Sequence, residues 1–207
     1  MDSTPMFPLG SVLFPHMPLP LRLFESRYLV MLGHLLEQDD PSFGVVLIER
    51  GQEVGGGEQR FGVGTMAQII EVDARKDFVS VVARGTDRFR VVDWEADGPY
   101  PRATLAPLPE LHWNSGLEPA RNEAESQVRR ALAAMEEVGG TVWPADVALA
   151  TDPMIATWQL AGLAPIGPMD QLSLLQVEST ADLLAAISRL SREVTDIMSL
   201  RRSESGE

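Results

Sequence analysis

The stretch PLPLRLFESRY, residues 18–28, says most about the fold, because it predicts a β-strand that leads directly into an α-helix. Successive side chains of a strand point to opposite faces, so one face carries three leucines: Leu19, Leu21 and Leu23. The helix is expected to begin near Ser26, with the Glu25 carboxylate beside its positive end, where a negative charge is stabilising. Apolar residues then recur with the spacing of one buried helix face: Tyr28, Met31, Leu32, Leu35 and Leu36.

Charged and aromatic residues crowd this strand–helix junction and admit three interpretations: a catalytic cluster, a ligand clamp or a structural corner. Arg22 shares the outer strand face with Pro20 and Phe24. Arg22 and Arg27 bracket Glu25 in sequence, and a partly buried Arg–Glu–Arg network would fix the angle between strand and helix. We therefore predict a structural corner formed by four residues: Arg22, Glu25, Arg27 and Tyr28. A ligand clamp stays open as a second interpretation for Arg22.

The composition is that of an ordinary soluble globular protein, 44% apolar and 23% charged over 207 residues. The net charge of −13 argues against nucleic acid as a partner, because phosphate binding requires a basic surface. There is no cysteine, so disulfides, thiolate metal sites and cysteine nucleophiles are excluded. The N-terminus lacks the features of a signal peptide, and no apolar run approaches the roughly 18 residues of a membrane span. We expect a cytoplasmic protein with no membrane partner.

The chain divides into a β-rich half and a helical half, which predicts an α+β fold with domains at 1–115 and 116–207. Short strands separated by Gly and Pro favour a compact barrel or sandwich in the first half, with these candidates: 43–49, 63–74, 78–85, 88–95 and 101–108. Helical periodicity in the second half predicts a bundle of about four helices. Asp152 and Pro153 mark one helix start, as N-cap and first helical residue.

Sequence motifs that carry catalysis are missing. The single lysine, Lys76, lies in a predicted hairpin turn, so neither a P-loop nor a Ser–Lys peptidase dyad is supported. The histidines His16, His34 and His112 lack metal-ligand spacing, and no G-x-S-x-G elbow occurs. The G-x-G-x-x-A match at 62–67 leads into a predicted strand, whereas a dinucleotide site requires a helix there. We therefore predict a protein that is not an enzyme and that binds no metal or cofactor.

Several segments carry a family resemblance when they are taken together in their order along residues 6–92: MFPLGSVLFPHMPLPLRLFESRYLVML, FGVVLIE, EVGG, VGTMAQIIEV and GTDRFRVV. The stretch WQLAGLAPIGPMDQLSLLQVESTADLLAAISRLSREV adds a helical part. The pattern resembles the N-terminal substrate-recognition domain of the Lon protease, in its stand-alone form. The resemblance implies a small PUA-like β-barrel with one helix, followed by a helical bundle, and recognition of unfolded or tagged polypeptide. It also implies that the ATPase and peptidase domains of the full protease are absent.

Given this resemblance, the candidate polypeptide-binding residues are those of an expected surface loop and a tryptophan near the domain junction: Phe14, Pro15, His16, Met17 and Trp113. Met17 suits varied partners because its side chain is flexible and polarizable. We expect polypeptide substrates or a partner protein to bind there, in an adaptor or regulator of protein quality control. A docking subunit of another complex, a PUA-like RNA-binding protein and an unrecognised hydrolase stay open as alternatives. The sequence leaves both a monomer and a weak dimer open.

Overall fold

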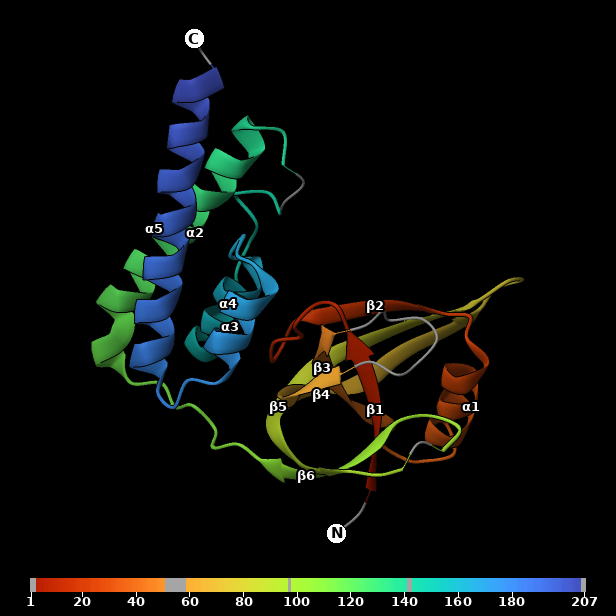
Figure 1. The fold of residues 1–207 in the computed structure, drawn as a ribbon. Helices are drawn as coiled ribbons and strands as arrows, with labels where there is room; N and C mark the ends of the chain where they lie inside the picture. Colours follow the sequence, from red (N-terminus) through yellow and green to blue (C-terminus); the bar gives the residue numbers. More distant parts are fainter. Residues whose placement is uncertain (1–2, 51–58, 97, 141–142, 206–207) are drawn as a thin grey trace. The chain divides into compact units, whose positions relative to one another are not determined.

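The chain folds into two compact units, Met1–Glu110 and Leu111–Glu207, which Figure 1 shows as a ribbon. The structure is a computed structural model, and the residues that it describes are 3–50, 59–96, 98–140 and 143–205. A mixed sheet with one helix forms the first unit, and helices form the second, so the predicted α+β class is confirmed. The EVGG segment of the family resemblance lies outside the described residues.

The first unit consists of one sheet and one α-helix, with these bounds: β1 Ser3–Leu9, β2 Pro18–Leu23, α1 Ser26–Leu35, β3 Ser42–Arg50, β4 Gln59–Ala74, β5 Val79–Trp94 and β6 Arg102–Pro107. The strand order is β2-β5-β4-β3-β1-β6. The β1–β3 pair is parallel, and the other pairs are antiparallel. Figure 1 shows α1 at the end of the sheet where the β4–β5 hairpin turns. Two residues, Phe24 and Glu25, link the end of β2 to the start of α1.

Strand pairing runs in a closed circuit, because β6 pairs with both β1 and β5. The circuit is β5–β4–β3–β1–β6, and β2 lies outside it, pairing only with β5 among the described residues. β4 and β5 are each 16 residues long. Their register shifts between Thr65 and Ala67 and again between Ile69 and Glu71. Such irregularities bend a strand, which allows the two long strands to curve around the core.

The strands differ from the predicted ones most at β5 and β1, and β4 begins at Gln59, before the predicted start at residue 63. The sequence predicts separate strands at 78–85 and 88–95, whereas β5 runs unbroken from Val79 to Trp94. Gly85 does not end the strand, because its missing side chain makes room for the neighbouring backbone of Phe14. β1 is not among the predicted strands, because its two prolines obscure the β pattern.

The main hydrophobic cluster of the first unit joins α1 to the sheet, and a smaller cluster lies around Met6 and Phe89. The Phe7 ring of β1 lies 4.1 Å, centroid to centroid, from the Tyr28 ring of α1. The helix buries the face that its periodicity predicts, through these residues: Tyr28, Met31, Leu32 and Leu35. Leu36 was expected on that face but is half exposed, because it is already the C-cap residue of α1.

The turn that precedes β2 is held against β5 at Gly85. The His16 N–H donates to the Gly85 carbonyl at 2.8 Å, and the Gly85 N–H donates to the Met17 carbonyl at 2.9 Å. His16 has a φ of 64°, in the left-handed region that non-glycine residues seldom adopt. A Cβ atom at Gly85 would lie 2.2 Å from the carbonyl oxygen of Phe14. Only glycine therefore fits at this position without displacing the turn.

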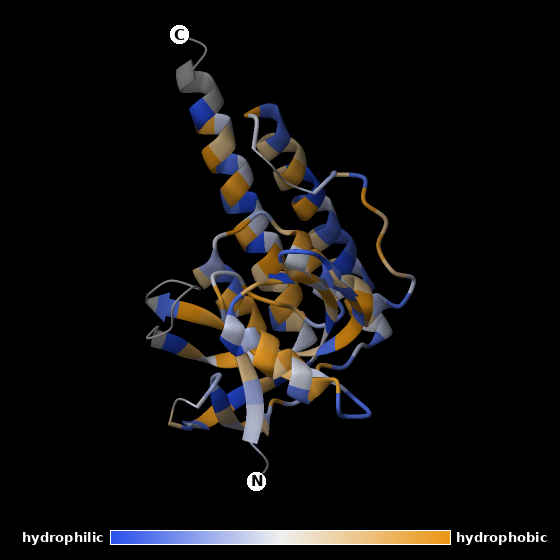
Figure 2. Ribbon diagram, turned by 90° about the vertical axis from the view of Figure 1, so that its right-hand side faces the viewer, coloured by the Kyte–Doolittle hydropathy of each residue, from blue (hydrophilic) through white to orange (hydrophobic). Residues whose placement is uncertain are grey.

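The second unit consists of helices, with these bounds: a 3-10 turn Ser115–Leu117, α2 Glu118–Glu137, α3 Pro153–Leu163, α4 Pro168–Leu175 and α5 Thr180–Ser205. The Asp152 carboxylate accepts from the N–H groups of Met154 and Ile155, each at 2.9 Å, so the predicted N-cap of α3 is confirmed. α2 and α5 pack side by side. Figure 2 shows hydrophobic and hydrophilic residues alternating along α5, as expected when one helix face is buried.

We predict that Gly85→Ala lowers the free energy of unfolding by about 1–3 kcal/mol, because the new methyl group would clash with backbone rather than with a flexible side chain. Gly62→Ala is the matched control, since it lies in β4 and an added Cβ atom meets nothing within 4 Å. Urea denaturation followed by circular dichroism measures both. Equal stability of the two variants would contradict the tight approach of the turn to β5.

Candidate functional site

The strand–helix corner contains an ion pair between two of the predicted corner residues. Arg27 Nε lies 3.1 Å from Glu25 Oε2, and each side chain is 19% exposed. The guanidinium carbon of Arg27 also lies 4.5 Å from the centroid of the Tyr28 ring, a cation–π contact. Glu25 is the N-cap residue of α1, and its backbone carbonyl accepts from the N–H groups of Tyr28 and Leu29. The pair therefore lies where β2 gives way to α1.

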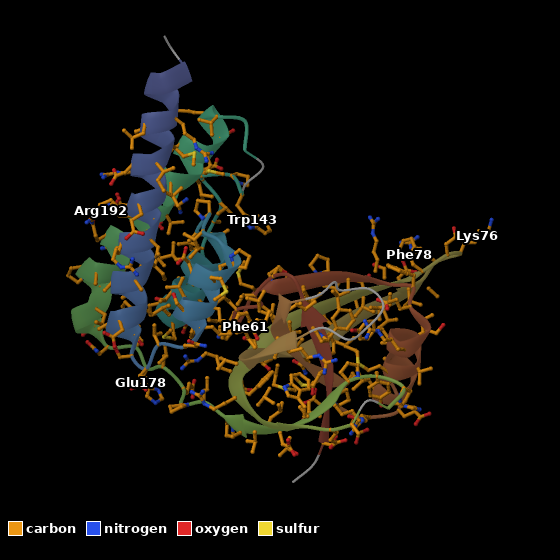
Figure 3. The ribbon with its side chains drawn as sticks, in the orientation of Figure 1. Phe61, Lys76, Phe78, Trp143, Glu178 and Arg192 are labelled. Carbon is orange, nitrogen blue, oxygen red and sulfur yellow. The ribbon has the colours of Figure 1, made fainter. Side chains whose placement is uncertain are left out.

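Arg22, the third charge of the predicted corner, points elsewhere. Its exposed guanidinium lies over the Phe78 ring, with 5.4 Å from the guanidinium carbon to the ring centroid. Figure 3 shows Phe78 near the exposed end of the β4–β5 hairpin. Strand alternation is the reason, because it places Arg22 on the outer face of β2. Within the described residues, the predicted Arg–Glu–Arg network is thus corrected to the pair of Glu25 and Arg27.

A cavity of about 280 Å³ lies beside the corner, between the C-terminal part of β1 and β2. Its floor is formed by buried apolar residues of the main cluster: Phe7, Leu9, Leu23 and Tyr28. Phe24 also lines the cavity, yet it is 59% exposed. Arg22 and Glu25 contribute the charged groups of the lining. Small-molecule sites usually measure about 300–1,000 Å³, so this cavity is at the lower limit of that range and has room for one or two side chains.

The predicted binding loop is partly a piece of the core. Phe14 is 1% exposed and Pro15 is buried, so the expectation that both offer apolar surface is wrong. The loop folds inward because its backbone is bound on both sides. Thr65 Oγ1 donates to the Leu13 carbonyl at 2.6 Å, and Gly85 holds the following turn. These hydrogen bonds hold the backbone on both sides of Phe14, whose ring lies in the interior.

The other predicted binding residues keep some exposure. His16 is exposed, and Met17 is half-buried with its side chain packed against the main cluster. Trp113 is half-buried and belongs to the second unit. His16 and Met17, which are consecutive in the chain, thus form the accessible part of one turn of the first unit. Their role in polypeptide binding stays a prediction.

The second unit has an exposed aromatic residue of its own, Trp143, which Figure 3 labels. Trp143 is 48% exposed and lines a cavity of about 400 Å³ together with residues of the α3–α4 turn, among them Leu163 and Pro165. The lining of this cavity contains no charged side chain among the described residues. It offers apolar contacts but no group for acid–base chemistry.

Arg88 of β5 is a buried charged residue that is not among the residues singled out from the sequence. Its Nη2 donates to the Pro109 carbonyl at 2.7 Å, and its own carbonyl accepts from the Leu108 N–H at 3.0 Å. Burial lowers the pKa of the Arg88 guanidinium from its ordinary value. Arg88 does not line the corner cavity. Its contacts point to a structural role, in which it holds the segment after β6 against β5.

The described parts of the chain contain no group of three His, Asp or Glu side chains arranged to hold a metal ion. None of the helices in these same parts combines the length and the apolar character of a membrane-spanning helix.

Comparison with known families gives a match over residues 3–192 to the ATP-dependent protease La (LON) substrate-binding domain. The chain belongs to this family. A LON peptidase N-terminal domain and RING finger protein of Schizosaccharomyces pombe is 31% identical over 126 residues, which are 55% of this chain and 25% of that protein. Lon protease 2 of Myxococcus xanthus is 33% identical over 104 residues, 49% of this chain and 12% of that protein. The chain thus matches a quarter or less of the length of these relatives.

Solved structures resemble the Lon-type chain over most of its length. A Lon N-terminal domain protein from Xanthomonas campestris has a TM-score of 0.62 and 25% identity, with 89% of this chain and 96% of that chain covered. The N-terminal domain of a Mycobacterium avium complex Lon protease has a TM-score of 0.64 at 14% identity, covering 92% and 98% of the two chains. The fold of this chain is therefore that of Lon N-terminal domains.

Phe24 is the surface residue that the sequence-based choice of binding residues missed. A signal for it was present, because strand alternation already placed Phe24 on the outer face beside Arg22. A large apolar residue in that position is a candidate contact residue. The cavity itself had no sequence signal, since it is formed by β1 together with β2 and α1.

We predict that Glu25→Ala lowers the free energy of unfolding by about 1–2 kcal/mol, between the values of exposed and fully buried ion pairs. The loss arises because the partly buried Arg27 guanidinium is deprived of the Glu25 carboxylate. Arg22→Ala is the comparison and should change stability by less than about 0.5 kcal/mol, as an exposed residue. Thermal unfolding of both variants measures this difference. A larger loss for Arg22→Ala would show that Arg22 is the main structural residue of the corner.

Proposed function

We propose that this Lon-type domain binds exposed apolar segments of other polypeptides at the corner cavity and catalyses no reaction itself. The observation that carries the proposal is Phe24, a large apolar side chain that is 59% exposed beside a cavity with an apolar floor. Aromatic residues are enriched in protein interfaces, where they contribute much of the binding energy. Family membership supports the same function, because the matched family is described as substrate-binding.

Several finer predictions belong to this proposal. The closed strand circuit supports a PUA-like barrel in the first unit, and α2 to α5 support a helical bundle in the second. We propose that the two units act as separate domains. The cellular role would be that of an adaptor or regulator in protein quality control, in the cytoplasm. His16, Met17 and Trp113 remain candidate contacts of a bound chain.

Docking within a larger complex is the second candidate function. It is favoured by the relative from S. pombe, whose name combines this type of domain with a RING finger. A docking subunit binds one native partner, whereas the proposed module binds unfolded chains of unrelated sequence. RNA binding finds less support, because a net charge of −13 opposes the approach of phosphates.

We predict that Phe24→Ser weakens binding to reduced, carboxymethylated α-lactalbumin, a permanently unfolded protein, by about tenfold, because an anchor side chain is lost. Val92→Ser is the matched control: Val92 is also 59% exposed in the same unit but does not line the cavity. Fluorescence anisotropy of the labelled unfolded protein measures both affinities, and native α-lactalbumin serves as the reference ligand.

Unchanged thermal stability of both variants is expected, since both side chains are mainly in solvent. If native and unfolded α-lactalbumin bound equally poorly to the wild-type protein, polypeptide recognition would be excluded as its function. Equal affinity of the Phe24 and Val92 variants would instead exclude the corner cavity as the binding site.

A further inference from the structure

The outer edge of β2 is open in the part of the chain that the structure describes. In the strand order, β2 is the terminal strand, and within the described residues it pairs only with β5. On the far side of the cavity, β1 pairs with β6 over Ser3–Pro5, and the Met6 N–H donates to the Pro101 carbonyl at 2.9 Å. The last three residues of β1 have no strand partner on that side in the described part of the chain. An open strand edge presents unpaired backbone groups to any chain that approaches.

The direction of the β2 backbone groups follows from two observations. The Met17 carbonyl accepts from the Gly85 N–H of β5, so the residues that follow Met17 at odd positions also turn their backbone groups toward β5. The residues at even positions then turn theirs toward the open edge: Pro18, Pro20 and Arg22. The two prolines among these residues support this direction, because a residue without an N–H is tolerated where no hydrogen bond to a neighbouring strand is needed.

The open edge is therefore rich in acceptors and poor in donors. Pro18, Pro20 and Arg22 each present a carbonyl group, but only Arg22 has an N–H to offer. A second copy of this chain, approaching through the same edge, would bring only one N–H per chain. An ordinary extended polypeptide brings an N–H at every residue except proline and satisfies all three carbonyls. The edge is thus complementary to a foreign chain and disfavours pairing with itself.

We propose that an extended polypeptide segment binds as an added strand along the open edge of β2, with an apolar side chain in the corner cavity. Alternate residues of the segment donate their N–H groups to the three outward carbonyls of β2, and Arg22 N–H returns one hydrogen bond. The main-chain bonds make binding tolerant of sequence, and the cavity beside Phe24 selects one apolar side chain. This inference rests on the proposed function and specifies how the segment is recognised.

Substitutions in the bound peptide test the inference from the ligand side. The probe is the tightest-binding 12-residue peptide from a set of overlapping peptides that cover the α-lactalbumin sequence. Single N-methyl groups are placed at each residue in turn, and affinity is measured by isothermal titration calorimetry. Strand addition predicts that methylation weakens binding about fivefold or more at alternate residues of a central stretch and has little effect between them. Losses without alternation would overturn the inference.

Substitutions in β2 test it from the protein side. Arg22→Pro and Arg22→Ala both remove the side chain, but only the proline removes the outward N–H, so we expect Arg22→Pro to bind about fivefold more weakly than Arg22→Ala. Pro20→Ala adds an N–H to the edge and should tighten binding by a similar factor. Pro20→Ala removes no hydrogen bond with β5 and should therefore fold. Its affinity can be measured even if Arg22→Pro is unstable.

The outcomes separate this inference from the proposed function. Peptide binding that is indifferent to N-methylation and to all three variants leaves polypeptide recognition standing and overturns strand addition. Absence of binding to every peptide and to unfolded α-lactalbumin overturns both. Sedimentation of the wild-type protein adds a further check, because a stable dimer that Pro20→Ala strengthens would identify a second copy, not a foreign chain, as the occupant of the edge.

Discussion

Two hydrogen bonds between Gly85 and the turn before β2 hold the register of that strand, and the inward direction of its leucines and the surface beside Phe24 depend on this register. A shift by one residue would exchange the two faces of β2. The three inward leucines of β2 would then leave the core: Leu19, Leu21 and Leu23. Pro20 would occupy a position that donates a hydrogen bond to β5, although proline has no N–H. The contact is possible only because Gly85 lacks a side chain that would meet the Phe14 carbonyl.

The same register shapes the candidate binding surface. It turns Phe24 and Arg22 outward while keeping the floor of the cavity apolar. The pair of Glu25 and Arg27 then marks the point where the chain leaves the sheet and enters α1. The structural pair of Glu25 and Arg27 and the exposed contact residue Phe24 are thus neighbours in sequence but have different roles. The corner supports the cavity, and the outer face of β2 offers a surface to a partner.

Proline has two functions in this architecture. In β2 it leaves the ladder with β5 intact, because Pro18 and Pro20 are at positions whose backbone groups face away from β5. It also removes donors from the exposed edge, which is how natural sheets avoid joining copies of themselves. An edge that is poor in donors can still accept from a chain that supplies them. Protection against self-association and capacity for binding are therefore compatible in one strand.

Local sequence patterns were enough to predict the α+β class, the buried face of α1, the N-cap of α3 and the family, because strand alternation, helix periodicity and capping are properties of residues close together in the chain. The burial of Phe14, the contact of Arg22 with Phe78 and the cavity beside Phe24 could be known from the three-dimensional fold alone. These outcomes depend on which distant backbone a segment meets, and a single sequence records no such pairing.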